Sequence, residues 1–411
     1  MNLSWVYTQV PFTGSGEEIA QDIREERTMV KVFTTTPKIV MGMGAIDTIG
    51  DEVLRRGAKK VLIVTDKGVI AAGLTQAIEK SLTAAGVAFS IFDGVEPDPR
   101  YEIVADCLSK VKSEGAELLI GVGGGSPMGI TKTTAVMATN DGPIGSYFGI
   151  DLIPKAGIPT ILVPTTAGTG SEVTPIAILS DEGEKLKKGV VSPYLYPSVG
   201  ILDPALTVGL PPHVTAATGM DALIHAVEAY TSINATGMTD MYCIRAIELI
   251  YNNLRIAYAK GDNVEARTAM MEGALLAGIG FANAGVTAVH AFAYPIGAEF
   301  HIPHGIANTL MLPHVIRYNV LGNLPKFAGL AKPFGIPTEG LDDLQIVDRV
   351  ITTIDRLADD LRVPRHLADY GVKEDDVPML AEGVMKVTRL LANNPRTLIL
   401  EDAKAIYKAA L

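Results

Sequence analysis

The chain has 411 residues, of which 48% are hydrophobic, so it is long enough and apolar enough to fill two cores. Its 35 lysines and arginines are outnumbered by 46 aspartates and glutamates, which gives a formal net charge of −11. Because no basic cluster offsets this charge, nucleic acid and anionic membrane surfaces are not expected partners.

The first 29 residues form a polar N-terminal extension that lacks the features of a secretory signal. Its role is left open between a loosely docked tail and a dimer contact. No run of about 18 apolar residues occurs, which argues against a membrane span. Cys107 and Cys243 are too few for a disulfide framework and fit a reducing compartment. We therefore expect a cytoplasmic protein.

In the first half of the chain, short β-branched segments alternate with helical ones. Four strands are predicted at residues 59–66 ("KKVLIVTD"), 89–93 ("FSIFD"), 117–126 ("ELLIGVGGGS") and 158–166 ("IPTILVPTT"). The stretches between the first three are long enough for crossover helices, which predicts a parallel, doubly wound sheet. Two further strand-like segments, "PIAILSD" and "SVGILDP", follow. The pattern indicates a Rossmann-like α/β domain.

Two glycine-containing turns follow strands of this predicted sheet. The first, "GVGGGSP" (121–127), precedes a helical stretch, so that backbone N–H groups could approach a pyrophosphate. The second, "PTTAGTGSEVTP" (164–175), carries hydroxyls at Thr165, Thr166, Thr169 and Ser171 that could donate to phosphate oxygens. Together the two turns favour a dinucleotide. Asp66 could accept from a ribose hydroxyl, which favours NAD over NADP, or it could cap a helix.

After "GLPPHV" (209–214) the strand signal disappears. Long Ala-, Leu- and Met-rich segments with helical spacing continue to the C-terminus, and Pro211 and Pro212 mark the expected boundary. We predict three parts: an extension (1–29), a dinucleotide-binding α/β domain (30–210) and an all-helical domain for metal and substrate (211–411).

The helical half contains a candidate metal site. Asp221 and His225 are four residues apart on a predicted helix, with Cβ atoms roughly 5–6 Å apart on one face. His290 lies among apolar residues, where an unpaired imidazole would be costly to bury, and His304 lies at a turn that could open a helix. This set of one oxygen and three nitrogen ligands leaves coordination positions open, which is typical of catalysis, and it accepts Fe(II), Zn(II) or another divalent ion. His301 is expected to lie outside it.

The sequence resembles the iron-containing (group III) alcohol dehydrogenase family over residues 30–411. The motifs "GGGSP", "PTTAGTGSEVTP", "ATGMDALIHAVEAY", "GVTAVHAFAYPIGAEFHIPHGIAN" and "LLANNPRTLILEDAKAIYKAAL" carry the resemblance. It implies a Rossmann-like domain, an all-helical domain and a homodimer or larger homo-oligomer. The implied metal ligands are Asp221, His225, His290 and His304. The implied nucleotide contacts are Asp66, Asp98, Gly124, Gly125, Ser126, Thr165, Thr166 and Lys188.

The resemblance also implies a reaction, namely hydride transfer between NAD(H) and a small alcohol or aldehyde. The metal, with Fe(II) favoured, would polarise the substrate oxygen as a Lewis acid. Tyr294 or water would move the proton. Tyr294 stands where many members have a histidine, and packing is its alternative role. Phe281 is the second candidate catalytic residue. Together with Phe292 it suggests a small apolar substrate, although core packing would also explain both side chains. Gly129 replaces an acid of many members and would widen the space nearby.

Four alternatives are kept beside this interpretation. Hydroxyacid–oxoacid transhydrogenase activity and 4-hydroxybutyrate- or glycerol-type dehydrogenase activity belong to the same superfamily. A dehydroquinate synthase-like lyase would need several lysines and arginines for a phosphorylated acid, whereas residues 221–304 offer mainly apolar side chains. A non-enzymatic module that binds metal and NAD is the last alternative. Oxidation of a panel of small alcohols would separate that module from an enzyme.

Overall fold

The computed structural model describes residues 30–184 and 186–411. By its internal contacts the chain divides into two units, Met1–Thr34 and Thr35–Leu411. The predicted N-terminal extension, residues 1–29, falls outside the described residues. Within the second unit, all the described strands lie between Ile39 and Leu202, and helices follow from Pro212 onward. The predicted fold class, an α/β part followed by a helical part, is confirmed.

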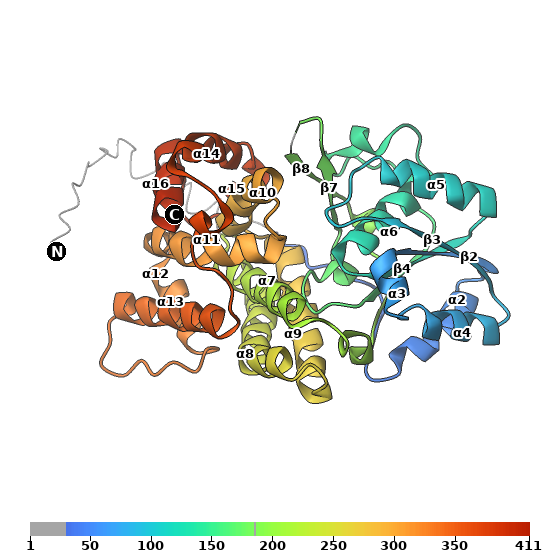
Figure 1. Cartoon of the computed structure of the whole chain (residues 1–411), viewed down its shortest axis with the longest axis horizontal. Helices are drawn as coiled ribbons and strands as arrows, with labels where there is room; N and C mark the ends of the chain where they lie inside the picture. The colour runs from blue at the N-terminus through green and yellow to red at the C-terminus, as the bar shows by residue number, and fades with distance from the viewer. Residues whose placement is uncertain (1–29, 185) are drawn as a thin grey trace. The chain divides into compact units, whose positions relative to one another are not determined.

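A six-stranded parallel sheet forms the centre of the α/β part (Figure 1). The strand order is β1-β9-β6-β4-β2-β3, and every neighbouring pair is parallel. Five of these strands coincide with segments predicted as strands, while β1 lies outside every predicted segment. The bounds are β1 (Ile39–Met41), β2 (Lys60–Asp66), β3 (Ala88–Val95), β4 (Leu118–Gly123), β6 (Thr160–Pro164) and β9 (Val199–Leu202).

Both faces of this sheet are buried, which explains why its strands are apolar without alternation. In β2, Val61 and Ile63 join one hydrophobic cluster, while Leu62 and Val64 join the cluster on the opposite face. The first face is covered by α2 (Ile49–Arg55) and α4 (Gln76–Ala84), the second by α5 (Ile103–Glu114) and α6 (Gly125–Met137). A short helix, α3 (Lys67–Ala71), follows β2 directly.

A second, three-stranded sheet has the order β5-β8-β7. The strand β8 (Leu186–Val191) is parallel to β5 (Gly149–Ile150) and antiparallel to β7 (Ile176–Asp181). β7 contacts α6, and β8 contacts α10 (Ala288–Phe300) of the helical part. This small sheet therefore brings side chains of β8 to the helices that carry the histidines.

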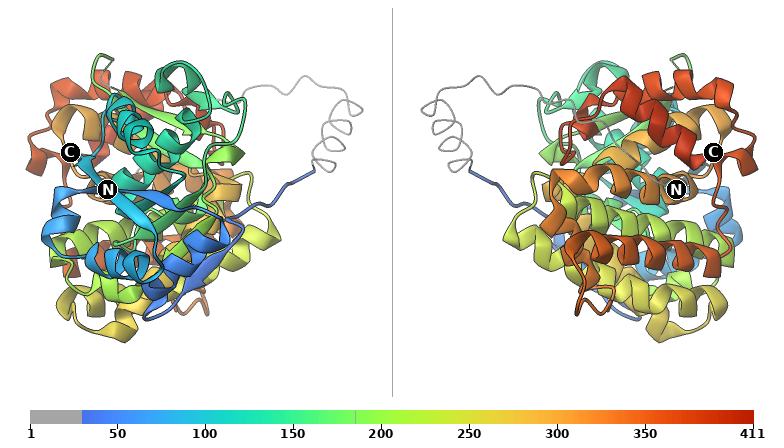
Figure 2. Two further views of the ribbon diagram at one scale, coloured as in Figure 1. Left: turned by 90° about the vertical axis from the view of Figure 1, so that its right-hand side faces the viewer. Right: turned by 90° about the vertical axis from the view of Figure 1, so that its left-hand side faces the viewer.

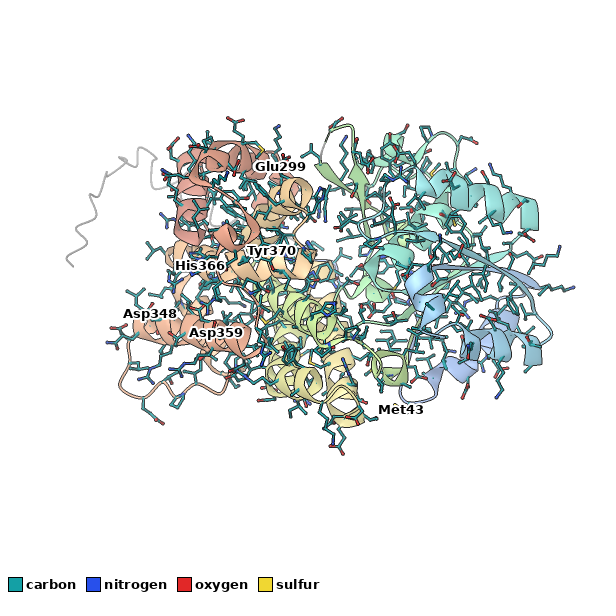
Figure 3. The ribbon with its side chains drawn as sticks, in the orientation of Figure 1. Met43, Glu299, Asp348, Asp359, His366 and Tyr370 are labelled. Atoms are coloured by element: carbon teal, nitrogen blue, oxygen red, sulfur yellow. The ribbon has the colours of Figure 1, made fainter. Side chains whose placement is uncertain are left out.

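The helical part buries one large continuous core. Its amphipathic pattern is clearest in α13, where Ile346, Val350 and Ile354 are buried while Asp348 and Asp359 point to solvent (Figure 3). The helices α7, α8 and α9 pack against one another, and the later helices continue the bundle (Figure 2). Besides α10, this part contains α7 (Pro212–Thr231), α8 (Gly237–Ala259), α9 (Val264–Ala284), α11 (His304–Asn319), α12 (Leu324–Ala328), α13 (Asp343–Asp360), α14 (Val377–Met385), α15 (Thr388–Leu391) and α16 (Leu400–Ala410).

Among the described residues, no single helix has the length and hydropathy needed to cross a membrane, although α9 and α10 pass that test together with a bend of 104° between them.

Candidate active site

A cavity of about 270 Å³ is lined from both parts of the second unit. One wall includes the start of α6, the turn after β6 and strands of the small sheet, and the other includes α7, α9, α10, α11 and α15. Of the predicted site residues, eleven line this cavity: Asp98, Gly125, Ser126, Thr169, Ser171, Asp221, His225, Phe281, His290, Tyr294 and His304. The glycine turn and the histidine cluster therefore face one shared space.

The two glycine turns meet because β4 and β6 are neighbours in the sheet. A Cβ on Gly125 would lie 2.9 Å from Cγ2 of Thr169, so a larger residue would have to displace the Thr169 side chain. Gly124 is the N-cap of α6, and a Cβ there would lie 3.7 Å from Oγ1 of Thr166. The free N–H groups at the start of α6 therefore lie beside hydroxyls, an arrangement suited to phosphate oxygens.

Other predicted nucleotide contacts have visible structural roles and do not line the cavity. The carboxylate of Asp66 caps α3 by accepting a hydrogen bond from Val69 N at 2.9 Å. Thr165 is buried, and its backbone N donates to Gly123 O at 3.0 Å. Gly124 and Thr166 likewise lie beside the cavity and do not line it. Asp66 therefore acts as a helix cap in this structure, and its contact with a ribose hydroxyl stays a prediction.

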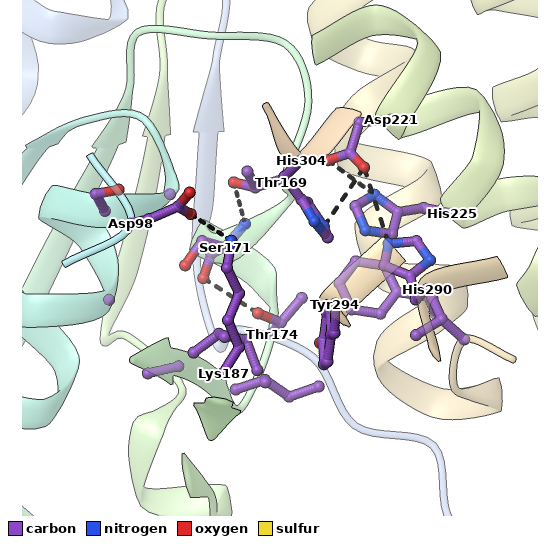
Figure 4. A pocket seen from close by; sticks show the side chains of 18 of the residues that line it. Asp98, Thr169, Ser171, Thr174, Lys187, Asp221, His225, His290, Tyr294 and His304 are labelled. Atoms are coloured by element: carbon purple, nitrogen blue, oxygen red, sulfur yellow. Dashed lines mark hydrogen bonds and ion pairs between the residues drawn. The ribbon is translucent and has the colours of Figure 1, made fainter. Parts of the chain in front are cut away.

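The lysine that lines the cavity is Lys187, whereas the family resemblance implied Lys188 as a nucleotide contact. Side chains alternate across a strand, so neighbours in β8 point to opposite faces. Nζ of Lys187 lies 2.7 Å from Oδ1 of Asp98 (Figure 4). Nζ of Lys188 instead pairs with Asp181 at 2.8 Å and Glu184 at 2.9 Å. Of these two lysines, Lys187 is therefore the one that lines the cavity, and the nucleotide contact of Lys188 stays a prediction.

Three of the four candidate metal ligands offer atoms that all lie within 4.8 Å of one another: Asp221, His290 and His304. Nε2 of His290 and Nε2 of His304 each lie 3.8 Å from Oδ1 of Asp221. Asp221 comes from α7, His290 from the first turn of α10, and His304 is the first residue of α11. Figure 4 shows these side chains pointing toward one another. Packing of three helices thus brings together residues that are distant in the sequence.

His225 completes the cluster from the next turn of α7. Its Nδ1 lies 4.0 Å from the other Asp221 oxygen, Oδ2, and has no hydrogen-bond partner among the described residues although it is buried. Its ring stacks on Phe281 on one side, with centroids 4.4 Å apart, and on His290 on the other, at 4.7 Å. A buried imidazole nitrogen with no partner is costly, which supports a ligand role.

A buried carboxylate, Glu228, orients His290 from behind. One carboxylate oxygen accepts from the Nδ1–H of His290, and the other accepts from Thr287 N (3.0 Å), Thr287 Oγ1 (2.7 Å) and Val289 N (2.8 Å). Burial raises the pKa of Glu228, but the charge and hydrogen bond of His290 outweigh it, so the pKa lies below its usual value. Nε2 of His290 is left to face the cluster as a lone pair.

Asn308, one turn after His304, places its amide nitrogen among the candidate ligand atoms. Nδ2 lies 2.8 Å from Oδ1 of Asp221, 3.1 Å from Nε2 of His290 and 3.2 Å from Nε2 of His304. An amide has two hydrogens for these three acceptors. The cluster therefore contains more lone pairs than protein donors, which is what a cation site requires.

The protonation of the cluster fits a metal as well. Burial lowers the pKa of His225 to about 4 and that of His304 to about 4, so both are neutral at pH 7. Burial raises the pKa of Asp221, but the charges of the three histidines outweigh it and the pKa lies below its usual value. Burial lowers the pKa of His290, but the charge and hydrogen bond of Glu228 outweigh it, so this pKa lies above its usual value and a metal would compete with a proton at Nε2. One carboxylate and deprotonated imidazoles form the donor set that first-row divalent metals take.

Tyr294 lies one turn after His290, with its ring centroid 6.0 Å from that of His304. Burial raises the pKa of its phenol, so it remains protonated at neutral pH. Phe281 lines the cavity, whereas Phe292 is fully buried against Tyr407 and belongs to the core. At Gly129 a Cβ would meet only Ala177, at 3.9 Å, so the space expected there is present.

Beneath the cavity floor lies Lys132, which is 1% exposed. Its Nζ donates to the carbonyls of Ser171 (2.7 Å), Thr174 (3.0 Å) and Ile176 (2.8 Å). Burial lowers the pKa of Lys132 to about 7. The ammonium thus holds the chain that runs from the second glycine turn into β7.

Sequence reasoning missed several functional candidates in this site. Glu228 had a signal, because it follows Asp221 and His225 by seven and three residues and so lies on the same face of one helix. Asn308 follows His304 by four residues in the same way. Lys187 could be separated from Lys188 only by knowing which face of β8 points inward. Arg389, which also lines the cavity, lies in a short helix with no local signal.

His301 lies apart from the cluster, as expected. It is exposed, ends α10 in a left-handed conformation with φ 53°, and does not line the cavity.

Comparison with known proteins supports this picture along almost the whole chain. Residues 36–204 match the family described as iron-containing alcohol dehydrogenase, and residues 215–411 match its C-terminal family. Sulfoacetaldehyde reductase of Bilophila wadsworthia is 40% identical over 385 residues, which cover 93% of this chain and 99% of that protein. NAD-dependent methanol dehydrogenase of Bacillus methanolicus is 36% identical over 379 residues, covering 92% and 99%.

A solved structure of 1,3-propanediol oxidoreductase superposes with a TM-score of 0.91 at 41% identity, covering 93% of this chain and 100% of that one. The family match, the shared fold and the cluster of Asp221 with the histidines agree with one another. The chain therefore belongs to the iron-containing alcohol dehydrogenase family and is an oxidoreductase of alcohols and aldehydes.

Proposed function

We propose that this protein transfers a hydride between NAD(H) and a small alcohol or aldehyde at the cavity between α6 and α10. The balanced reaction is alcohol plus NAD⁺ giving aldehyde, NADH and a proton. The observation that carries this proposal is that Gly125 and Ser126, at the start of α6, face Asp221 and His290 across one cavity. A dinucleotide held at α6 would direct its nicotinamide toward the histidine cluster.

Asp221, His225, His290 and His304 are proposed to hold a divalent metal. When bound there, the metal supplies a Lewis acid that polarises the substrate oxygen. We favour Fe(II) because the matching family is described as iron-containing, and Zn(II) or another divalent ion is the alternative. Glu228 keeps the Nδ1–H of His290 occupied so that Nε2 points inward, and Asn308 donates to Asp221.

The remaining side chains position the reactants. The start of α6 and the hydroxyl of Ser126 are proposed to bind the pyrophosphate of NAD, and Lys187, paired with Asp98, lies at the edge of this site. NADP remains the alternative cofactor. Tyr294, with its pKa raised by burial, is proposed to donate a proton to the substrate oxygen when an aldehyde is reduced. Phe281 is proposed to hold the ring of His225 in place by stacking on it.

Location and assembly are proposed on separate grounds. Cys107 and Cys243 are both free and buried, which favours a reducing compartment such as the cytoplasm. A homodimer or larger homo-oligomer is proposed from the family resemblance, and light scattering of the purified protein would measure it.

The metal and the reaction are tested together with His290→Ala. Loss of both bound metal and NAD-linked oxidation of 1-propanol is expected, because one imidazole and its Glu228 partner are removed. His213→Ala is the matched control, since His213 is exposed on α7 and does not line the cavity. Full turnover in metal-free wild-type protein would contradict the proposal.

A further inference from the structure

The cavity contains one cationic side chain that the proposed reaction does not use, Arg389. It lies in α15 and lines the cavity together with Tyr294 and His290. The guanidinium rests against β8 at Gly189, which has no side chain. A Cβ added at Gly189 would lie 3.5 Å from Nη2 of Arg389. Arg389 is thus placed at the end of the cavity where Tyr294 and the histidines lie.

The other charged side chains of this cavity have partners. Lys187 pairs with Asp98 at 2.7 Å, and Asp221 faces the histidines and accepts from Asn308. The Arg389 side chain hydrogen-bonds to Tyr294, but among residues 30–184 and 186–411 no carboxylate lies within 4.0 Å of its guanidinium. A guanidinium carries five N–H donors in a planar fork, and this fork matches the two oxygens of an acid group.

The position of Arg389 also indicates that it would contact the substrate and not the cofactor. Its guanidinium rests against Gly189 of β8, and its charge acts on Tyr294 and His290 of the helical wall, while Gly125 and Ser126 lie at the start of α6. A cation that served the cofactor's phosphates would be expected beside Gly125 and Ser126. An anion bound by Arg389 would instead belong to the molecule whose reacting oxygen lies at the histidine cluster.

We propose that Arg389 selects a short aldehyde or alcohol that carries an anionic group, a carboxylate or a sulfonate, at the end opposite its reacting carbon. This inference rests on the proposed function and names its substrate class. It replaces the expectation of a largely apolar substrate, which was drawn from Phe281 and Phe292. For such an aldehyde, for example 4-oxobutanoate, the reaction is 4-oxobutanoate plus NADH plus a proton giving 4-hydroxybutanoate and NAD⁺.

The test compares length-matched probes, 4-oxobutanoate and butanal, in steady-state reduction with NADH. The wild-type enzyme is expected to have the higher kcat/KM for 4-oxobutanoate. In Arg389→Gln the ratio of the two kcat/KM values should fall about 10- to 100-fold, which corresponds to a hydrogen bond to a charged group. Arg389→Lys, which keeps the charge but not the fork, should recover part of this ratio. A purely structural role would lower both values together.

Lys386→Gln is the matched control, because it removes an exposed cation three residues away that does not line the cavity. Its ratio should equal that of the wild type. Propionate, ethanesulfonate and methylphosphonate, used as competitive inhibitors against butanal, identify which acid group fits. Inhibition by none of them would overturn the proposal, as would a wild-type preference for butanal.

The remaining outcomes separate this inference from the proposed function. A rise in the KM for NADH in Arg389→Gln, with an unchanged ratio, would assign Arg389 to the cofactor and overturn the inference. Wild-type reduction of butanal without preference for 4-oxobutanoate would leave the oxidoreductase assignment standing while removing the anionic substrate. Absence of activity on both probes and on 1-propanol would contradict the proposed function itself.

Discussion

The Nδ1–H of His290 donates to the carboxylate of Glu228, and this contact decides which ring nitrogen faces the candidate metal site. The same Glu228 carboxylate also accepts from Val289 N and Thr287 N, so that it ties the start of α10 to α7. An imidazole whose second nitrogen is fixed in this way loses little freedom when it binds a cation. One buried acid thus couples local backbone structure to the proposed ligand geometry.

Glu228→Gln is expected to weaken metal affinity by about 10- to 100-fold, because the ionised partner of His290 is lost while the shape of the side chain is kept. Competition with a chelator of known affinity measures the change. Glu265→Gln, an exposed acid in the first turn of α9, should leave the affinity at the wild-type value. Equal affinity in all three proteins would refute the orienting role of Glu228.

Tyr294→Phe is expected to lower kcat for aldehyde reduction by about 100-fold, the lower range for loss of a proton donor. Because burial raises the pKa of Tyr294, the phenol remains protonated and able to donate across neutral pH. Metal content and the midpoint of thermal unfolding should change little, since only one hydroxyl is removed. Stopped-flow kinetics separates the chemical step from product release.

Tyr194→Phe serves as the control for Tyr294→Phe, because Tyr194 is 44% exposed and does not line the cavity. If kcat in Tyr294→Phe equals that of the wild type, the proton is supplied by water and Tyr294 is a packing residue.

Gly305→Ala should disrupt the cluster without touching a ligand. A Cβ at this position would lie 2.1 Å from the backbone oxygen of Ala217 and 3.3 Å from Cβ of Asp221, so α11 must move away from α7. A loss of about 1–3 kcal/mol in the free energy of unfolding is expected from such overpacking. Bound metal should fall as well, because His304 precedes Gly305 directly.

Urea unfolding and metal analysis of Gly305→Ala measure these two effects. The comparison variant is Gly237→Ala, at the first residue of α8, where an added Cβ meets no atom within 4 Å. That variant should be at least as stable as the wild type. A stable Gly305→Ala protein with full metal content would show that α11 is not held against α7 as the structure has it.

The lowered pKa of the partly buried His314 predicts that the free energy of unfolding falls in acid. Burial, together with the charges of Arg317, Arg365 and His366, lowers its pKa to about 4, against about 6.5 in the unfolded chain. His366 lies in the segment after α13 (Figure 3). Between these two values the unfolded state binds more protons, so the free energy of unfolding falls as pH decreases from about 6.5 to about 4. The stabilisation is complete above pH 6.5.

In His314→Gln, the loss in the free energy of unfolding between about pH 6.5 and about pH 4 should be smaller by about 1–3 kcal/mol. This range is below the value for the whole pKa shift because His314 is partly exposed to solvent. Urea unfolding at a series of pH values, with chelator present throughout, measures it. The exposed His213→Gln should keep the wild-type slope. An identical slope in His314→Gln would mean that His314 already titrates normally in the folded protein.

Much of the fold could be predicted from the sequence because the signal is local. Apolar runs such as 59–66 form strands buried on both faces, and the glycine turn at 121–127 ends a strand and opens α6 as expected. The i,i+4 spacing of Asp221 and His225 placed both on one face of α7. These features follow from backbone periodicity and from glycine's freedom at turns, which each segment carries by itself.

Only the tertiary structure decided which side chains share the cavity. Arg389 comes from a four-residue helix far along the chain, and nothing near it in sequence marks it as facing His290 and Tyr294. Lys187 and Lys188 are adjacent residues of the same type, so the sequence does not tell which of them lines the cavity. The orientation of β8 decides it, because its side chains point alternately to opposite faces. Such contacts depend on how distant segments pack, and packing is set by the whole core rather than by the spacing within any one segment.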